Sequence, residues 1–327
     1  MGIDWALVGL FMTSLLANSV YSVIAPFYPQ VAGDKGVRSE IVGFIFSAYP
    51  IAAFITSPIL GLFISKIGRK RTLAAGGFLI VPFIQALTMF GFGITPLLAG
   101  LVFSVLSFCT RFMQGVGGGI IGTATYAIIA SNYPDNMPVV LGMQNMLAGV
   151  GMMVGPLLGS LLYGLGGFSF LFFVYGGLFL ALLPLSYLLI PKDRPYEKPK
   201  QEVSLRSLIM HKTLFLDGLV VSLSMIAMSF LEPILSTHLE SYGVPVEVIG
   251  VMFTIPTVSY ALTAVFVGKL PKSWTPKVIM LQGLVLTSIS LLLIGPWAFL
   301  SLPRSLWIVV VGLAVLGVGI GECVCKL

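Results

Sequence analysis

The chain has 327 residues, of which 57% are hydrophobic and only 9% are charged, and its mean hydropathy is +1.03. A soluble domain carries about a quarter charged residues on average, so this composition excludes an ordinary water-facing protein. The net charge of +6 does not indicate nucleic-acid binding, because the basic residues lie between long apolar runs, where membrane orientation explains them.

Ten apolar runs follow one another along the chain, and each is long enough to cross about 30 Å of hydrocarbon as a helix. Gly, Pro and Asn residues separate the runs, which is typical of turns. The first run has no positive segment before it and is too long for a signal peptide, so we expect it to be a span. The predicted spans are residues 3–31, 40–64, 72–92, 97–130, 139–163, 167–190, 213–239, 246–268, 276–296 and 304–325.

Basic residues gather in the loops that follow the even-numbered spans. The opposite loops contain only Lys35, Arg38 and Arg304. Because positive residues are retained on the cytoplasmic side, we expect a cytoplasmic N-terminus and a cytoplasmic segment 191–212. The sequence leaves open whether the membrane belongs to a vesicle or other endomembrane, or is the plasma membrane.

The segment 191–212 is a long charged linker that follows six predicted spans. The sequence therefore predicts an all-α multi-pass membrane protein in three parts. Residues 1–190 form an N-terminal six-helix bundle, residues 191–212 a cytoplasmic linker, and residues 213–327 a second bundle of helices 7–10.

The loop between the second and third predicted spans reads G-L-F-I-S-K-I-G-R-K-R over residues 61–71. Its glycines permit a close approach and a tight turn, and its cations hold the loop at the cytoplasmic face. An ordinary basic loop would explain the charge but would not require the glycines. The candidate residues of this loop are Gly61, Lys66, Gly68, Arg69, Lys70 and Arg71.

The fourth predicted span contains an arginine, in the string R-F-M-Q-G-V-G that begins at Arg111. A charged side chain within a membrane is costly, so Arg111 must face protein or a water-filled cavity and is a functional candidate. The alternative is a structural role in packing against the loop of residues 61–71.

The fifth predicted span carries small residues at four-residue spacing, in the string G-M-M-V-G-P-L-L-G. Small residues at this spacing let two helices pack closely, and we expect the proline to bend the span. Such spacing is common in membrane helices, so the G-P-x-x-G core supplies most of the specificity. The candidate residues are Gly151, Gly155, Pro156 and Gly159.

Two carboxylates lie in the seventh predicted span, Glu232 and, about four turns earlier, Asp217. A carboxylate in hydrocarbon is costly unless it is neutralised or paired, which suits a group that binds a proton or a cation. Glu232 could instead be a helix-end residue near the outer interface, and Asp217 could favour the N-terminal dipole of its helix.

Polar side chains within the first and fifth predicted spans are candidate cavity residues. They are Asn18 and Tyr21 in the first span, and Gln144 and Asn145 in the fifth. Membrane helices also use such residues to hold one another together, so both interpretations stay open.

These motifs resemble those of the major facilitator superfamily, whose members have two six-helix halves joined by a cytoplasmic linker. The resemblance implies that the loop of residues 61–71 gates conformational exchange, that Arg111 acts in proton relay or tunes carboxylates, and that the fifth-span motif accompanies antiport. Ser65 stands where the superfamily usually has aspartate. The second half is two helices short of that layout, and we expect helices 11 and 12 to be missing from this chain.

Within the superfamily, the string L-E-P at Glu232 and the first-span string from Asn18 to Pro29 resemble vesicular amine transporters, particularly the polyamine branch. The monoamine-carrying members usually have an acid where this chain has Ala17, which speaks against monoamines. The resemblance implies proton-coupled antiport of an organic cation, such as a polyamine or another amine or drug. The alternatives to this function are transport of a neutral or anionic solute, or a receptor-like or regulatory role without transport.

The expected partners are the lipid bilayer, a small-molecule substrate and protons, and we expect the chain to act as a monomer. His211 and His238 are the two histidines of the chain, and no metal-ligand or nucleophile arrangement can be assembled around them. We therefore expect no enzymatic activity, no metal and no cofactor.

Overall fold

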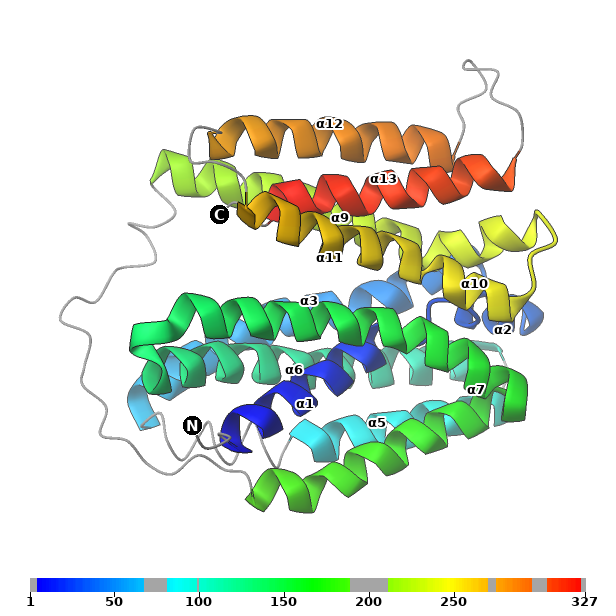
Figure 1. Cartoon of the computed structure of the whole chain (residues 1–327). Coiled ribbons are helices and arrows are strands. Elements are labelled where there is room, and N and C mark those ends of the chain that lie inside the picture. Colours follow the sequence, from blue (N-terminus) through cyan, green and yellow to red (C-terminus); the bar gives the residue numbers. More distant parts are fainter. Residues whose placement is uncertain are drawn as a thin grey trace. The chain divides into compact units, whose positions relative to one another are not determined.

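The computed structural model describes residues 5–67, 81–98, 100–188, 211–269, 275–295 and 305–324 (Figure 1). Over these residues the regular structure is helical and contains no β-strand. The chain forms two compact units, unit 1 with residues 1–196 and unit 2 with residues 197–327. The boundary falls in the predicted linker, most of which lies outside the described residues.

The described residues of unit 1 form five long helices and three short ones. The long helices pack in pairs, α1 with α7, α3 with α6, and α5 with both α6 and α7. In a bilayer, helices satisfy their own backbone hydrogen bonds, which is why apolar runs of this length fold this way. The elements are α1 Trp5–Ser22, α2 Tyr28–Asp34, α3 Ser39–Ile67, α5 Val81–Ile94, the 3₁₀ turn η2 Thr95–Leu97, α6 Gly100–Asn132, the 3₁₀ turn η3 Pro134–Asn136, and α7 Met137–Leu188.

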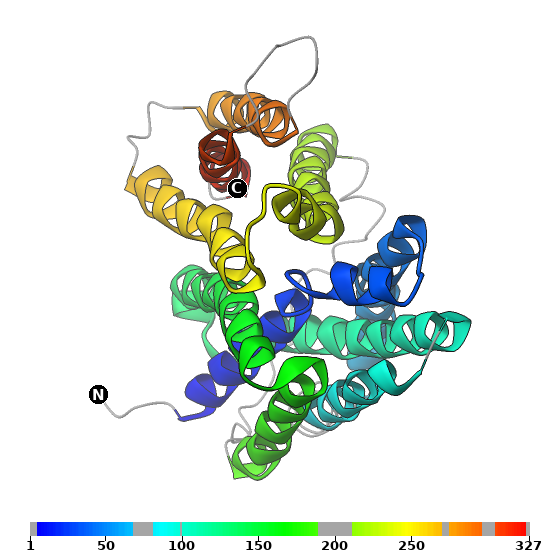
Figure 2. The same cartoon turned by 90° about the vertical axis from the view of Figure 1, so that its right-hand side faces the viewer.

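Unit 2 is built around its last helix. This helix, α13, packs against α12, α11 and α9, and the end-on view in Figure 2 shows it between them. Glycines allow the close approach: a Cβ at Gly319 would lie 2.8 Å from the backbone oxygen of Gly283 on α12. The elements are α9 Lys212–Glu240, α10 Val246–Met252, α11 Thr254–Lys269, α12 Pro276–Ile294 and α13 Leu306–Val324.

Two predicted spans are interrupted. The span predicted over residues 3–31 is α1 followed by α2, with a turn between Ser22 and Tyr28, because Pro26 lacks a backbone N–H and Pro29 fits the first turn of a new helix. The span predicted over residues 246–268 is α10 and α11, since Pro256 cannot donate to the carbonyl four residues earlier.

The long helix α7 contains the fifth and sixth predicted spans. They separate at Gly167, whose φ of 75° and ψ of −172° lie outside the helical region and are accessible because glycine has no Cβ. Helix α7 continues through Pro156, so the bend expected there does not break the helix. Gly167 is the residue of α7 that departs from helical backbone angles.

Seven helices of the described residues are long and apolar enough to cross a membrane, and two shorter apolar helices cover Leu7–Ser22 and Val81–Leu97. Large apolar side chains point outward: Phe54 is 81% exposed and Leu101 is 77% exposed, as suits contact with lipid rather than water. The all-α membrane fold is therefore confirmed. Each of the ten predicted ranges contains helix, and the number of crossings stays a prediction.

The glycines predicted to permit close packing in α7 face α1. A Cβ at Gly151 would overlap the backbone oxygen of Leu15, and a Cβ at Gly155 would overlap the backbone oxygen of Ser19. At Gly159 it would lie 2.8 Å from a methyl of Val23. The motif therefore sets the distance between α1 and α7.

One end of unit 1, where η2 and Gly167 lie, is filled with aromatic rings. Lys35 closes this end, because its Nζ donates to the backbone oxygens of Pro96 and Leu98, each at 2.8 Å. Lys35 is one of the few cations in the predicted external loops. These hydrogen bonds explain its presence there by a structural role. The packed rings belong to Phe27, Tyr28, Phe92, Phe103, Phe168 and Phe172.

Replacing Gly155 by alanine should destabilise unit 1 by about 1–3 kcal/mol, because the added methyl would force α1 and α7 apart. Gly149→Ala on the same helix is the matched control, since a Cβ there would meet no atom within 4 Å. Thermal unfolding of the purified protein in detergent, followed by circular dichroism, measures the difference. Equal unfolding midpoints for the two variants would contradict the packing role of Gly155.

Candidate functional site

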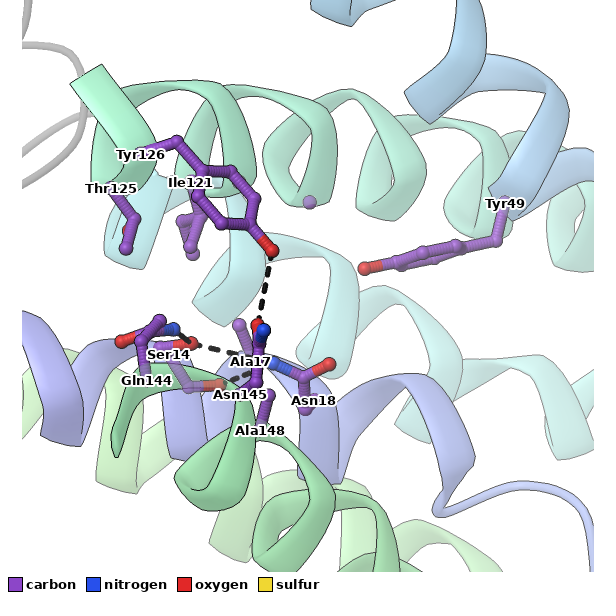
Figure 3. A pocket seen from close by; sticks show the side chains of 12 residues that line it. Ser14, Ala17, Asn18, Tyr49, Ile121, Thr125, Tyr126, Gln144, Asn145 and Ala148 are labelled. Atoms are coloured by element: carbon purple, nitrogen blue, oxygen red, sulfur yellow. Dashed lines mark hydrogen bonds between the residues drawn. The ribbon is translucent and has the colours of Figure 1, made fainter. Parts of the chain in front are cut away.

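A cavity of about 160 Å³ lies inside unit 1, between α1, α3, α6 and α7 (Figure 3). Its lining combines amides, hydroxyls and small side chains with Ile121, and none of the described residues that line it is charged. A cavity of about 150 Å³ holds a benzene-sized molecule, whereas pockets for drug-sized ligands measure about 300–1,000 Å³. The cavity alone therefore suits one end of a larger ligand. The lining residues are Ser14, Ala17, Asn18, Tyr49, Gly118, Ile121, Gly122, Thr125, Tyr126, Gln144, Asn145 and Ala148.

Hydrogen bonds join the helices around this cavity. Asn18 Nδ2 donates to the backbone oxygen of Ser14 at 2.8 Å, and Gln144 Nε2 donates to the Ser14 hydroxyl, which links α7 to α1. The Tyr126 hydroxyl donates to Asn145 Oδ1 at 3.1 Å, which links α6 to α7 (Figure 3). These bonds fix several lining side chains before any ligand binds.

Arg111 is fully buried on α6, next to the cavity wall. Its Nη1 donates to Gln114 Oε1 at 2.8 Å and to the backbone oxygen of Tyr21 at 3.2 Å. Its guanidinium carbon also lies 5.1 Å from the ring centroid of Tyr49, 5.5 Å from that of Tyr21 and 5.8 Å from that of Phe46. Cation–π contacts of this kind contribute about 0.5–2 kcal/mol each, more when desolvated.

The rest of the string that begins at Arg111 supports this arrangement. A Cβ at Gly115 would lie 2.8 Å from the backbone Cα of Tyr49, so this glycine lets α3 approach α6 and brings Tyr49 to the arginine. Gln85 of α5 donates to the backbone oxygen of Gln114 at 3.2 Å. These contacts join Arg111 to α1, α3 and its own helix.

The predicted site residues separate into groups. Asn18 and Asn145 line the cavity, and Tyr21 lies behind it, with its ring centroid 4.7 Å from that of Tyr49. Glu232 is 7% exposed on α9 of unit 2, whereas Asp217 on the same helix is only half-buried.

The loop motif is mostly beyond the described residues. Gly68, Arg69, Lys70 and Arg71 lie outside them, and Lys66 is described only as part of α3. At Gly61, a Cβ would meet no atom within 4 Å, so the close approach expected there is not seen in the described part of the chain.

Sequence reasoning missed four polar residues of the cavity, Ser14, Tyr49, Thr125 and Tyr126. Ser14 precedes Asn18 by four residues and therefore shares its helix face, a signal that was available in the sequence. The two tyrosines follow no such pattern, because their position depends on which helices pack together.

Solved structures with this fold are membrane transporters. A bacterial homologue of the human lysosomal transporter Spinster, in an inward-facing unoccupied conformation, superposes with a TM-score of 0.71 at 14% identity and covers 100% of this chain and 75% of its own. A D-xylose-proton symporter superposes with a TM-score of 0.66 at 12% identity and covers 97% of this chain and 80% of its own. The chain thus shares its fold with both of these proteins.

The Major Facilitator Superfamily family model matches residues 10–321, and the chain belongs to this family. The human MFS-type transporter SLC18B1 is 29% identical over 321 residues, which span 97% of this chain and 69% of that protein. The multidrug resistance protein MdtG of Citrobacter koseri is 27% identical over 320 residues, 92% of this chain and 73% of that protein. The protein is therefore a transporter of this superfamily and not an enzyme.

Arg111→Lys should lower the stability of unit 1 by about 1–3 kcal/mol, because lysine keeps the charge but loses the planar fork that donates to two oxygens and contacts three rings. Thermal unfolding in detergent measures the loss. The control is Arg38→Lys, whose side chain is 77% exposed beside Glu40 and should leave the midpoint unchanged. A midpoint for Arg111→Lys equal to that of the wild type would contradict the structural importance of these contacts.

Proposed function

We propose that the protein exchanges protons for an organic cation, such as a polyamine or another amine or drug-like molecule, by alternating access. The observation that carries the proposal is Glu232, a carboxylate that is 7% exposed within the 29-residue apolar helix α9. An ionisable group at such a position is costly to the fold and is by default a functional candidate. The relatives named for multidrug resistance agree with a drug-like substrate.

Glu232 suits this exchange because its two states need different partners. The charged carboxylate in a desolvated helix requires a cation, whereas the protonated acid does not. A substrate ammonium and a proton therefore compete for the same group. Asp217 lies nearer the start of α9 and is half-buried, so it has less need of a neutralising ligand.

The other sequence motifs take supporting roles in this proposal. The glycines of α7 hold α1 and α7 in contact, the loop of residues 61–71 gates the exchange, and Arg111 braces the wall of the unit 1 cavity. The N-terminus is cytoplasmic, the host membrane is that of a vesicle or the plasma membrane, and the protein works as a monomer.

Glu232→Gln should abolish uptake driven by a pH gradient, because glutamine cannot take up and release the proton. Purified protein in proteoliposomes, with an imposed gradient and labelled spermidine, measures the uptake. Glu247→Gln, at an exposed position on α10, is the matched control and should retain it. Full pH-driven uptake by Glu232→Gln would remove this residue from the mechanism.

A neutral solute is the second candidate, and the uncharged lining of the unit 1 cavity favours it. In the same proteoliposomes, excess spermidine, a monoamine and a neutral sugar are offered as competitors. If an organic cation is the substrate, only the amines should compete. Competition by the sugar alone would favour the neutral solute.

A further inference from the structure

Gln144 has an unsatisfied hydrogen-bond acceptor at the cavity of unit 1. The side chain is 5% exposed, and its Nε2 donates to the Ser14 hydroxyl. Its Oε1 is buried and accepts no hydrogen bond from the described residues. A buried polar atom without a partner costs about 1–3 kcal/mol, so its presence in a packed bundle needs a reason.

The amide of Gln144 directs its nitrogen to the Ser14 hydroxyl on α1. Asn18 Nδ2 donates to the backbone oxygen of Ser14 and lies 3.5 Å from its hydroxyl oxygen. Ser14 therefore receives amide nitrogens from both α1 and α7. With the nitrogen of Gln144 directed to α1, its oxygen is the atom left for a ligand.

The remaining cavity groups offer the oxygen of Gln144 no cation. No Lys, Arg or His lines the cavity, and Ala17 and Ala148 contribute only methyl groups. The Tyr126 hydroxyl is directed to Asn145 Oδ1. Gln144 Oε1 can thus accept a hydrogen bond from an N–H or O–H group brought by a ligand.

We propose that this cavity is the subsite for an amino group of the substrate, and that Gln144 Oε1 accepts a hydrogen bond from its N–H. The proposal rests on the proposed transport of an organic cation and adds which part of that cation unit 1 recognises. The volume of about 160 Å³ admits an aminoalkyl end but not a whole drug-sized molecule. Gln144 is a binding residue that selects N–H donors over cations of equal charge.

The test compares two ligands of the same charge. In 1,6-diaminohexane both nitrogens carry N–H donors, whereas hexamethonium has the same six-carbon chain and the same charge but no N–H. Affinities of both for the purified protein are measured by equilibrium dialysis. Gln144→Met, which keeps the volume and removes the acceptor, should weaken diamine binding about 10- to 100-fold and change hexamethonium binding less than about twofold.

Two further variants control the result. Gln85 is a buried glutamine of the same unit whose Oε1 likewise has no partner among the described residues, but it does not line the cavity. Gln85→Met should leave the ratio of the two affinities unchanged. Gln144→Glu keeps an acceptor oxygen and should preserve the preference for the diamine.

The outcomes separate this subsite from the proposed function. If the wild type binds the diamine and Gln144→Met binds it equally well, the subsite is wrong and cation transport stands. Equal losses of affinity for both ligands in Gln144→Met would also overturn the subsite. The same change of the affinity ratio in Gln85→Met would overturn it as well. If the wild type binds hexamethonium alone, the amino-group subsite fails; if it binds neither ligand, cation transport fails with it.

Discussion

The contact between α1 and α7 determines the geometry of unit 1. In a bilayer there is no hydrophobic driving force between helices, so association depends on close packing and on polar bonds between them. The glycines at 151, 155 and 159 remove the side chains that would hold the two backbones apart. Two turns before Gly151, the same approach places Gln144 against Ser14, so the packing motif also positions the cavity wall.

Arg111 shows how a buried charge is accommodated without leaving the bundle. The sequence offered two interpretations, a role in proton transfer and a structural role against the basic loop. Arg111 contacts the Tyr21 backbone and the rings of Tyr21, Phe46 and Tyr49, whereas most of the loop lies outside the described residues. Since Tyr49 also lines the cavity, the guanidinium supports its wall and places a positive charge close behind it.

Helix positions could be predicted from the sequence because each span must satisfy its own backbone in lipid. The interruptions in the first and eighth spans depend on one or two prolines each, and the effect of a proline on a long apolar run is hard to read from composition. Asn18 and Asn145 were found because a polar amide within a span is conspicuous. Tyr49 and Tyr126 were not, because their approach to the cavity follows from the pairing of α3 and α7 with α6, which no local pattern reveals.

The two units offer different chemistry, and the cavity of unit 1 can be understood without reference to unit 2. Glu232 of unit 2 is a buried carboxylate. In unit 1 the charge of Arg111 opposes a bare cation, so an amino group in its cavity must be held by neutral acceptors. An amide oxygen meets that need without adding a charge, and the bond it forms, about 1.5–3 kcal/mol, is weak enough to break in each transport cycle. N–H recognition by Gln144 would then let the cavity of unit 1 favour amines over permanently methylated cations of the same charge.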